Sequence, residues 1–167
     1  MMKISIFNVA ALILLTGCSP SSEVVKDGAD IASKIDNTMS NTVIESQNDF
    51  EGTEERLLQA IKDKGLKLFI AIDHGQGAQS VGQDIGQSKV FIFGDPKAGT
   101  PLIVENSQMG LELPLKMLIT APANGPVQII YAPITSTAQS YGIEGKDQLL
   151  AKISGNLEDL ATTAAKP

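Results

Sequence analysis

Two apolar runs on either side of Asn124-Gly125 constrain the fold of this chain most. The segment from residue 111 to residue 133 reads LELPLKMLITAPANGPVQIIYAP. Asn and Gly tolerate the positive φ angles of tight hairpin turns, so the segment predicts two antiparallel strands joined by a turn. Pro114 in the first run predicts an edge strand or a bulge, because proline cannot donate to the ladder of hydrogen bonds. The sheet is therefore expected to be antiparallel at least in part.

Two amphipathic segments predict the main helices. The first is residues 49–65. Asp49 or Thr53 can cap the helix near its start, and Gly65 suits the position after it. Residues 145–161 place apolar side chains along one stripe of a helix. Both helices therefore have one face to bury.

Alternating or apolar stretches predict three further strands, at residues 42–47, 66–73 and 89–94. Two stretches rich in glycine or proline, residues 74–88 and 95–110, predict loops with short helical turns. The resulting order is β-α-β-β-β-β-α. Two amphipathic helices can cover one face of a mainly antiparallel sheet, which makes the expected fold class α+β.

The first 17 residues have the features of a bacterial signal peptide. Lys3 is the only charged residue before an apolar run that is shorter than the roughly 20 residues of a membrane-spanning helix. Leu15-Thr16-Gly17-Cys18 resembles the lipobox of bacterial lipoproteins, in which the cysteine is lipidated before cleavage. The alternative is an ordinary signal peptide followed by an unrelated cysteine. A disulfide within the chain is excluded, because Cys18 is the only cysteine.

The lipobox predicts how the chain is organised and where it works. Residues 1–17 are expected to be removed, residues 18–41 to form a flexible tether, and residues 42–165 to form one α+β domain. Two or three acyl chains on Cys18 would hold the protein stably on a membrane. Ser19 stands where an Asp would resemble an inner-membrane retention signal. We therefore expect an envelope protein, on the periplasmic side of the outer membrane if the cell has two membranes.

The charge balance excludes one class of partner. The chain carries 13 Lys and Arg against 19 Asp and Glu, a net charge of −6, which becomes −7 when Lys3 is lost with the signal peptide. Nucleic acid is not expected as a partner, because contacts with phosphates need Lys and Arg. The membrane is expected as a partner only through the lipid on Cys18.

Three segments together resemble the domain of unknown function 302 family of bacteria and archaea. They read TEERLLQAIKDKGLKLFIAIDHG, FIFGDPKAGTPLI and LELPLKMLI, in the order and spacing of the family. FGDPKAGTPL at residues 93–102 looks like the family's F-G-N-P-x-x-G-T-P-L, with Asp95 where Asn is common. The likeness covers about residues 42–142. It implies a TBP-like α+β fold, with a curved antiparallel sheet and helices on one side, and a tendency to dimerise, but no reaction.

His74 is the only histidine, and it opens a glycine-rich loop after a strand. It has two interpretations: a metal or acid-base site with Asp73 or Asp95 nearby, or a structural hydrogen bond. The second is preferred, because a lone His without further ligands is a poor metal site. The rigid loop at residues 94–101 fits a connector and a binding rim equally well. The candidate ligand-binding residues are Asp73, His74, Asp95, Lys97 and Lys116.

Catalytic and nucleotide-binding motifs are incomplete in this sequence. The glycines that follow His74 do not match the dinucleotide fingerprint, because Ser80 stands where the third glycine belongs. No serine or cysteine has a recognisable nucleophile setting. We therefore expect no cofactor, and an enzyme or metal carrier centred on His74 is the second hypothesis beside a binding module.

Strand alternation also predicts an uncovered apolar face of the sheet. If Leu68, Ile70 and Ile72 face the helices, residues of opposite parity gather on the other side, with Glu112 and Lys116 at their edge. An exposed apolar face usually binds a partner, so we expect a homodimer of this lipid-anchored module. The residues predicted for this face are Phe69, Phe91, Phe93, Leu118 and Ile130.

The lipobox leads to the first testable prediction. Cys18→Ser should abolish acylation and move the protein from the membrane fraction toward the soluble fraction, because the thiol is the acceptor of the lipid. Mass spectrometry of the mature N-terminus and fractionation of the cells measure both effects. Acylation that persists in this variant would contradict the assignment.

Overall fold

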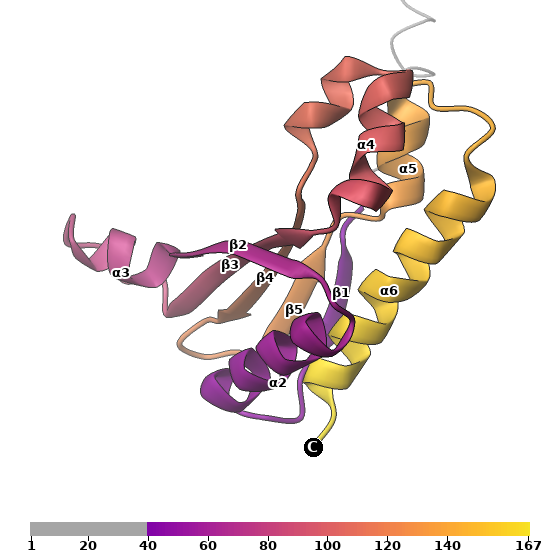
Figure 1. Cartoon of the computed structure of the whole chain (residues 1–167). Coiled ribbons are helices and arrows are strands. Elements are labelled where there is room, and N and C mark those ends of the chain that lie inside the picture. The colour runs from indigo at the N-terminus through magenta and orange to yellow at the C-terminus, as the bar shows by residue number, and fades with distance from the viewer. Residues whose placement is uncertain (1–39) are drawn as a thin grey trace, which may run out of the picture.

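The structure is a computed structural model, and it describes residues 40–167. Five antiparallel strands form a single sheet in the order β1-β5-β4-β3-β2, with helices packed against one of its faces (Figure 1). The strands are β1 (Thr42–Glu45), β2 (Lys67–Asp73), β3 (Gln87–Gly94), β4 (Leu115–Ala121) and β5 (Gln128–Tyr131). The helices are α2 (Phe50–Asp63), α3 (His74–Gln79), α4 (Pro96–Glu105), the 3-10 helix η1 (Ser107–Leu111), α5 (Ile134–Ser140) and α6 (Asp147–Ala165). The expected α+β class and mainly antiparallel sheet are confirmed.

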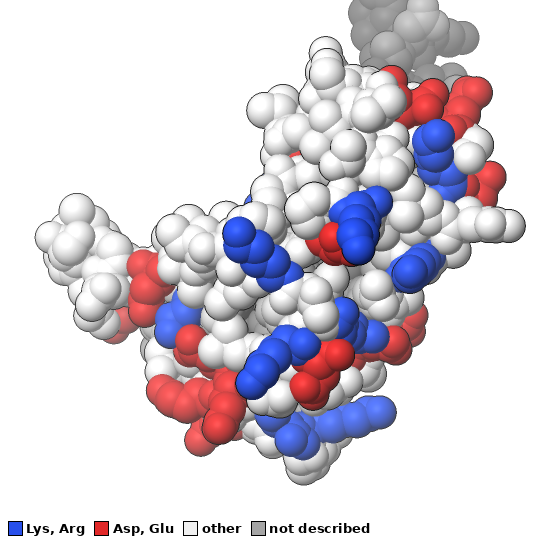
Figure 2. Space-filling view, in the orientation of Figure 1, with Lys and Arg blue, Asp and Glu red and all other residues white. Residues whose placement is uncertain are grey.

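α2 forms where its capping residues predict it. The Asp49 carboxylate accepts a hydrogen bond from the Gly52 amide at 2.8 Å, and Gly65 adopts a positive φ of 65° just after the helix ends. Leu57 and Ile61 are buried on its inner face. α2 and α6 pack together and cover the sheet, with acidic and basic side chains on their outer surfaces (Figure 2).

Helical structure is more extensive than the sequence predicts between β3 and β4. Residues 95–110 were expected to be a loop with a helical turn, but α4 and η1 occupy most of this stretch. Asp95 caps α4 and Pro96 suits its first turn, whereas Pro101 inside the helix is unfavourable for helical structure. Leu102 and Met109 are fully buried. Their burial supplies the stability that local propensity does not predict.

The hairpin between β4 and β5 is confirmed, with a longer connection than the Asn-Gly pair suggests. β4 ends at Ala121 and β5 begins at Gln128, and Asn124 does not adopt a positive φ. Pro114 lies just before β4 rather than within it. Its missing amide therefore removes no hydrogen bond from the ladder.

The core lies between α2, α6 and the inner face of the sheet. In the cross-strand register, Phe91 is opposite Met117 and Ile119 is opposite Ile129. All four side chains are fully buried. Contacts between these neighbouring strands and the two helices therefore hold the domain together.

The prediction that Phe91 and Phe93 lie on the uncovered face is wrong. Both rings are fully buried under the helices. The prediction sets the two rings on the side opposite Leu68, but the cross-strand register pairs Leu68 with Phe93, so the rings lie on the helix-facing side. A second departure from the prediction lies in β2, where the register shifts between Leu68 and Ile70. This bulge reverses the parity of the strand, so Leu68 and Ile70 face opposite sides of the sheet, although their spacing of two predicts the same side.

The uncovered outer face is nevertheless apolar, with aliphatic side chains in place of the predicted rings. Ile72, Val90, Leu118 and Ile130 share this face across successive strands. Leu118 and Ile130 belonged to the predicted set, whereas Phe69 lies at the bulge and contributes to a cavity on the helix side. An apolar outer face is thus present with a changed composition.

Neighbouring residues of β3 test the corrected face assignment. Phe91→Ala should lower the free energy of unfolding by about 3–5 kcal/mol, because it empties a fully buried site. Ile92→Ala is the matched control on the half-exposed outer face, and it should cost less than about 2 kcal/mol. Urea denaturation at low protein concentration measures both values. A larger loss for Ile92→Ala would contradict the assignment.

Candidate functional site

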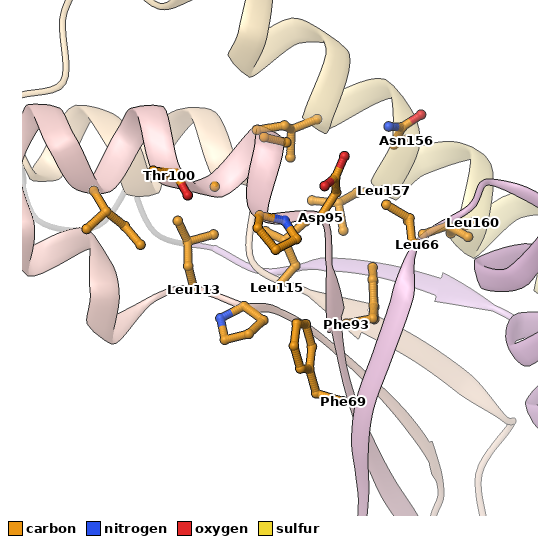
Figure 3. Close-up of a pocket in the computed structure, with 16 residues that line it drawn as sticks. Leu66, Phe69, Phe93, Asp95, Thr100, Leu113, Leu115, Asn156, Leu157 and Leu160 are labelled. Carbon is orange, nitrogen blue, oxygen red and sulfur yellow. The ribbon is translucent and has the colours of Figure 1, made fainter.

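A cavity of about 230 Å³ lies where the ends of β2 and β3 meet α4, α6 and the segment before β4 (Figure 3). Each of these elements contributes side chains to its wall. Thr100 is exposed and Asp95 is half-exposed, so the cavity can be reached from the surface. Its wall combines many apolar side chains with a few polar groups, as small-molecule sites commonly do.

The wall of this cavity is mostly apolar. The bulge in β2 brings the Phe69 side chain to the same cavity as Phe93 of β3. α6 contributes Leu157 and Leu160, which also belong to the core. The apolar side chains of the wall are Leu66, Phe69, Phe93, Ala98, Ile103, Leu113, Leu115, Ile153, Leu157 and Leu160, together with Pro96 and Pro114.

Three polar side chains line the cavity: Asp95, Thr100 and Asn156. Asp95 Oδ1 accepts a hydrogen bond from the Lys97 amide at 2.9 Å, which places the carboxylate at the start of α4. Asn156 Oδ1 accepts a hydrogen bond from Lys64 Nζ at 3.4 Å. Among the lining residues that the structure describes, Asp95 alone carries a charge.

The position of Asp95 follows from local structure. β3 ends at Gly94, and α4 starts two residues later with Pro96 in its first turn. Asp95 between them has an extended backbone with φ −126° and ψ 121°. An Asp at this position accepts a free amide of the first helical turn, so capping fixes its side chain at the start of α4, beside the cavity.

The structure separates the residues that were considered as one site. Asp73 and His74 lie at one end of β2, whereas Asp95 and Lys97 lie near its other end, since Lys67 pairs with Gly94. β2 has seven residues, so its ends are roughly 20 Å apart. A site that combines His74 with Asp95 is therefore not formed within one chain.

His74 is the first residue of α3, which projects beyond the sheet (Figure 1). It is exposed, and Asp73 beside it accepts the Gln76 amide at 2.8 Å as the cap of this helix. Within residues 40–167, no three His, Cys, Asp or Glu side chains gather where they could hold a metal ion. The hydrogen bond at this strand end is therefore accepted by Asp73, whereas the sequence pattern favours a structural hydrogen bond of His74.

Lys116 belongs to a different cluster, on the outer face of β4. Its Nζ is 4.0 Å from Glu112 Oε2, and the Tyr141 hydroxyl donates to Glu112 Oε1 at 2.9 Å. The hydrogen bond to the Glu112 carboxylate raises the pKa of Tyr141. Lys116 thus has an acidic neighbour and does not face the cavity.

Comparison with known proteins identifies the domain. The profile of the family described as "Domain of unknown function DUF302" matches residues 42–160. The chain belongs to the DUF302 family. Its DUF302 domain is similar to the crystal structure of an uncharacterized conserved DUF302 protein from Bacillus stearothermophilus, with a TM-score of 0.67 and 18% sequence identity. That match covers 74% of this chain and 97% of the other, and it shows that the fold is shared.

The DUF302 chain is also similar to two curated Brucella proteins. It is 28% identical over 137 residues to the fluoride-specific ion channel FluC 1 of Brucella suis biovar 1 (strain 1330), covering 81% of this chain and 53% of that protein. The FluC 1 protein of Brucella abortus biovar 1 (strain 9-941) matches at 28% identity, with 50% of its length covered. This chain thus spans about half the length of these relatives. Among residues 40–167, no helix is long and apolar enough to cross a membrane.

Only part of this cavity can be predicted from the sequence. The Gly- and Pro-rich stretch singles out Asp95, which lines the cavity, and Lys97, which does not. Phe69, Leu113 and Asn156 carry no signal of a shared site. These residues lie around one cavity because of the bulge in β2 and the packing of α6. No local pattern in the sequence reveals either feature. The apolar stripe of residues 145–161, which includes Leu157 and Leu160, predicts that these side chains are buried. It does not predict that they border a cavity.

Proposed function

We propose that this protein is a binding module of the cell envelope, tethered to a membrane by a lipid on Cys18, and that it binds a small, mostly apolar ligand in its cavity. The observation that carries the proposal is the 230 Å³ cavity with an apolar wall and a few polar groups at its mouth. Cys18 and the tether lie outside the described residues, and their role rests on the lipobox.

The size of the cavity favours a ligand over a packing defect. The cavity opens to the surface and has a mostly apolar wall, as small-molecule sites commonly do. An engineered apolar cavity of about 150 Å³ in another protein binds benzene, so a cavity of 230 Å³ has room for a ring with a short chain. Burying apolar ligand surface there contributes about 25 cal/mol per Å² of area removed from water.

Fluoride is not the ligand we propose for this cavity. The Brucella relatives are named as fluoride-specific ion channels, and this chain covers only about half of each. The charged group that lines the cavity here is the Asp95 carboxylate, which repels an anion. We propose that the half shared with these relatives is a binding module that works beside a membrane.

Adjacent residues of α4 provide a matched test of the cavity. Ile103→Trp should lower affinity for a neutral probe, 2-phenylethanol, about tenfold or more, because Ile103 lines the cavity and the larger ring fills it. Val104→Trp should leave affinity unchanged, since Val104 is 80% exposed and is not part of this wall. Isothermal titration calorimetry measures both.

Two results would contradict the proposed site. One is a wild-type protein that does not bind the probe at millimolar concentration. The other is a pair of variants that bind equally well. Mass spectrometry of small molecules extracted from the purified protein would identify a natural ligand directly.

Self-association through the outer face of the sheet is a second candidate function. Three aliphatic side chains on this face are highly exposed: Val43 at 50%, Ile70 at 52% and Ile72 at 41%. Ile72 is opposite Val90 and Val43 is opposite Ile130, and half-buried Leu118 of the central strand connects these two pairs across the face. A contiguous apolar face of this kind commonly binds another protein surface, and a second copy of the domain offers a matching one.

A charge on the outer face tests the proposed dimer. Ile72→Glu should convert a dimer to a monomer without unfolding the domain, because the side chain is exposed within one chain. Val104→Glu, on α4, is the control and should leave the mass unchanged. Light scattering on the wild type and both variants measures the mass. A wild-type protein that is monomeric at high concentration would rule out the dimer.

A further inference from the structure

The cavity also indicates the chemical class of its ligand. We infer, on the basis of the binding function proposed above, that the ligand is an organic cation: an apolar body with one ammonium group that pairs with Asp95. The inference combines the unused capacity of this carboxylate, the two aromatic rings of the wall and the charges around the mouth.

Asp95 has capacity for a further partner. Its Oδ1 accepts the Lys97 amide at 2.9 Å, and within residues 40–167 no hydrogen bond or ion pair involves its Oδ2. A carboxylate offers about four acceptor sites on its two oxygens. In Figure 3 the carboxylate lies at the side of the cavity nearest to Asn156 of α6. A charged donor in the cavity can therefore bind Oδ2 without breaking a hydrogen bond of the protein.

The aromatic wall favours the same sign of charge. Phe69 and Phe93 both line the cavity, and the negative faces of such rings attract cations. Lys67 Nζ lies 4.9 Å from the centre of the Phe69 ring, so a ligand ammonium group would share this ring with a lysine of the protein. A cavity that combines aromatic rings, a carboxylate and an apolar wall is suited to bind an alkylammonium group.

The lysines near the mouth do not reverse this preference. Lys64 is neutralised by Asp159, with Nζ and Oδ2 3.0 Å apart. Lys67 and Lys97 are exposed, so water and salt screen their charges. Asp95, by contrast, is half-buried against apolar side chains, where charge interactions are stronger. An anionic head group would meet this carboxylate and be repelled.

Three probes of similar shape test the inference: 2-phenylethylammonium, 2-phenylethanol and 3-phenylpropanoate. The full chain is reconstituted in phosphatidylcholine nanodiscs, and titration calorimetry is corrected with empty nanodiscs. The ammonium should bind about tenfold more tightly than the alcohol, as expected for a charged hydrogen bond, and the carboxylate should bind most weakly.

Matched substitutions of two capping residues locate the effect. Asp95→Asn should remove the preference for the ammonium over the alcohol, because it removes the charge, and α4 should stay folded because Asn caps a helix as well as Asp does. Asp73→Asn changes the equivalent cap of α3 at the other end of β2, and should keep the preference.

The outcomes separate this inference from the proposed function. If the alcohol binds and the ammonium has no advantage, or if the advantage survives Asp95→Asn, the cation assignment is overturned and the apolar site stands. A carboxylate that binds most tightly would overturn it too, and would point to the lysines. If none of the three probes binds, both proposals fail.

Discussion

The packing of α6 against the inner face of the sheet is the contact on which the rest of this structure depends. Leu157 and Leu160 are almost completely buried there, and α2 packs beside them. The same two leucines form part of the cavity wall. One helix thus closes the core and borders the cavity, so the part of the cavity wall that α6 supplies is fixed by core packing.

The bulge in β2 is the second constraint. It decides which side chains of this strand face the cavity and which lie on the outer face of the sheet. It brings Phe69 to the cavity and places Ile70 on the outer face, so one irregular step contributes to both candidate interfaces. Because the cavity and the outer face use different sides of the sheet, ligand binding and self-association are compatible in one molecule. The edge position of β2 gives the strand freedom for this irregularity, since only β3 pairs with it.

The chemistry of the cavity suits a module that works close to a membrane. An apolar wall with one carboxylate suits the small amphipathic cations proposed above, and the acidic charge of the chain disfavours nucleic acid. A lipid on Cys18 would keep the module near the compartment where such molecules partition. The Brucella relatives, which are about twice as long as the part they share with this chain, are consistent with the same domain joined to a membrane protein.

Local patterns in the sequence determined the two main helices, the five strands, the antiparallel hairpin and the family. Capping by Asp49, strand alternation and helical stripes depend on near neighbours, so they can be read from the chain itself. The tertiary structure decided which face of each strand is buried, that α4 is a helix despite Pro101, and that Phe69, Asp95 and Asn156 share a cavity. These features depend on one bulge and on contacts between residues far apart in the chain. A shift of one residue reverses every side chain of a strand, and no local pattern records where that shift occurs.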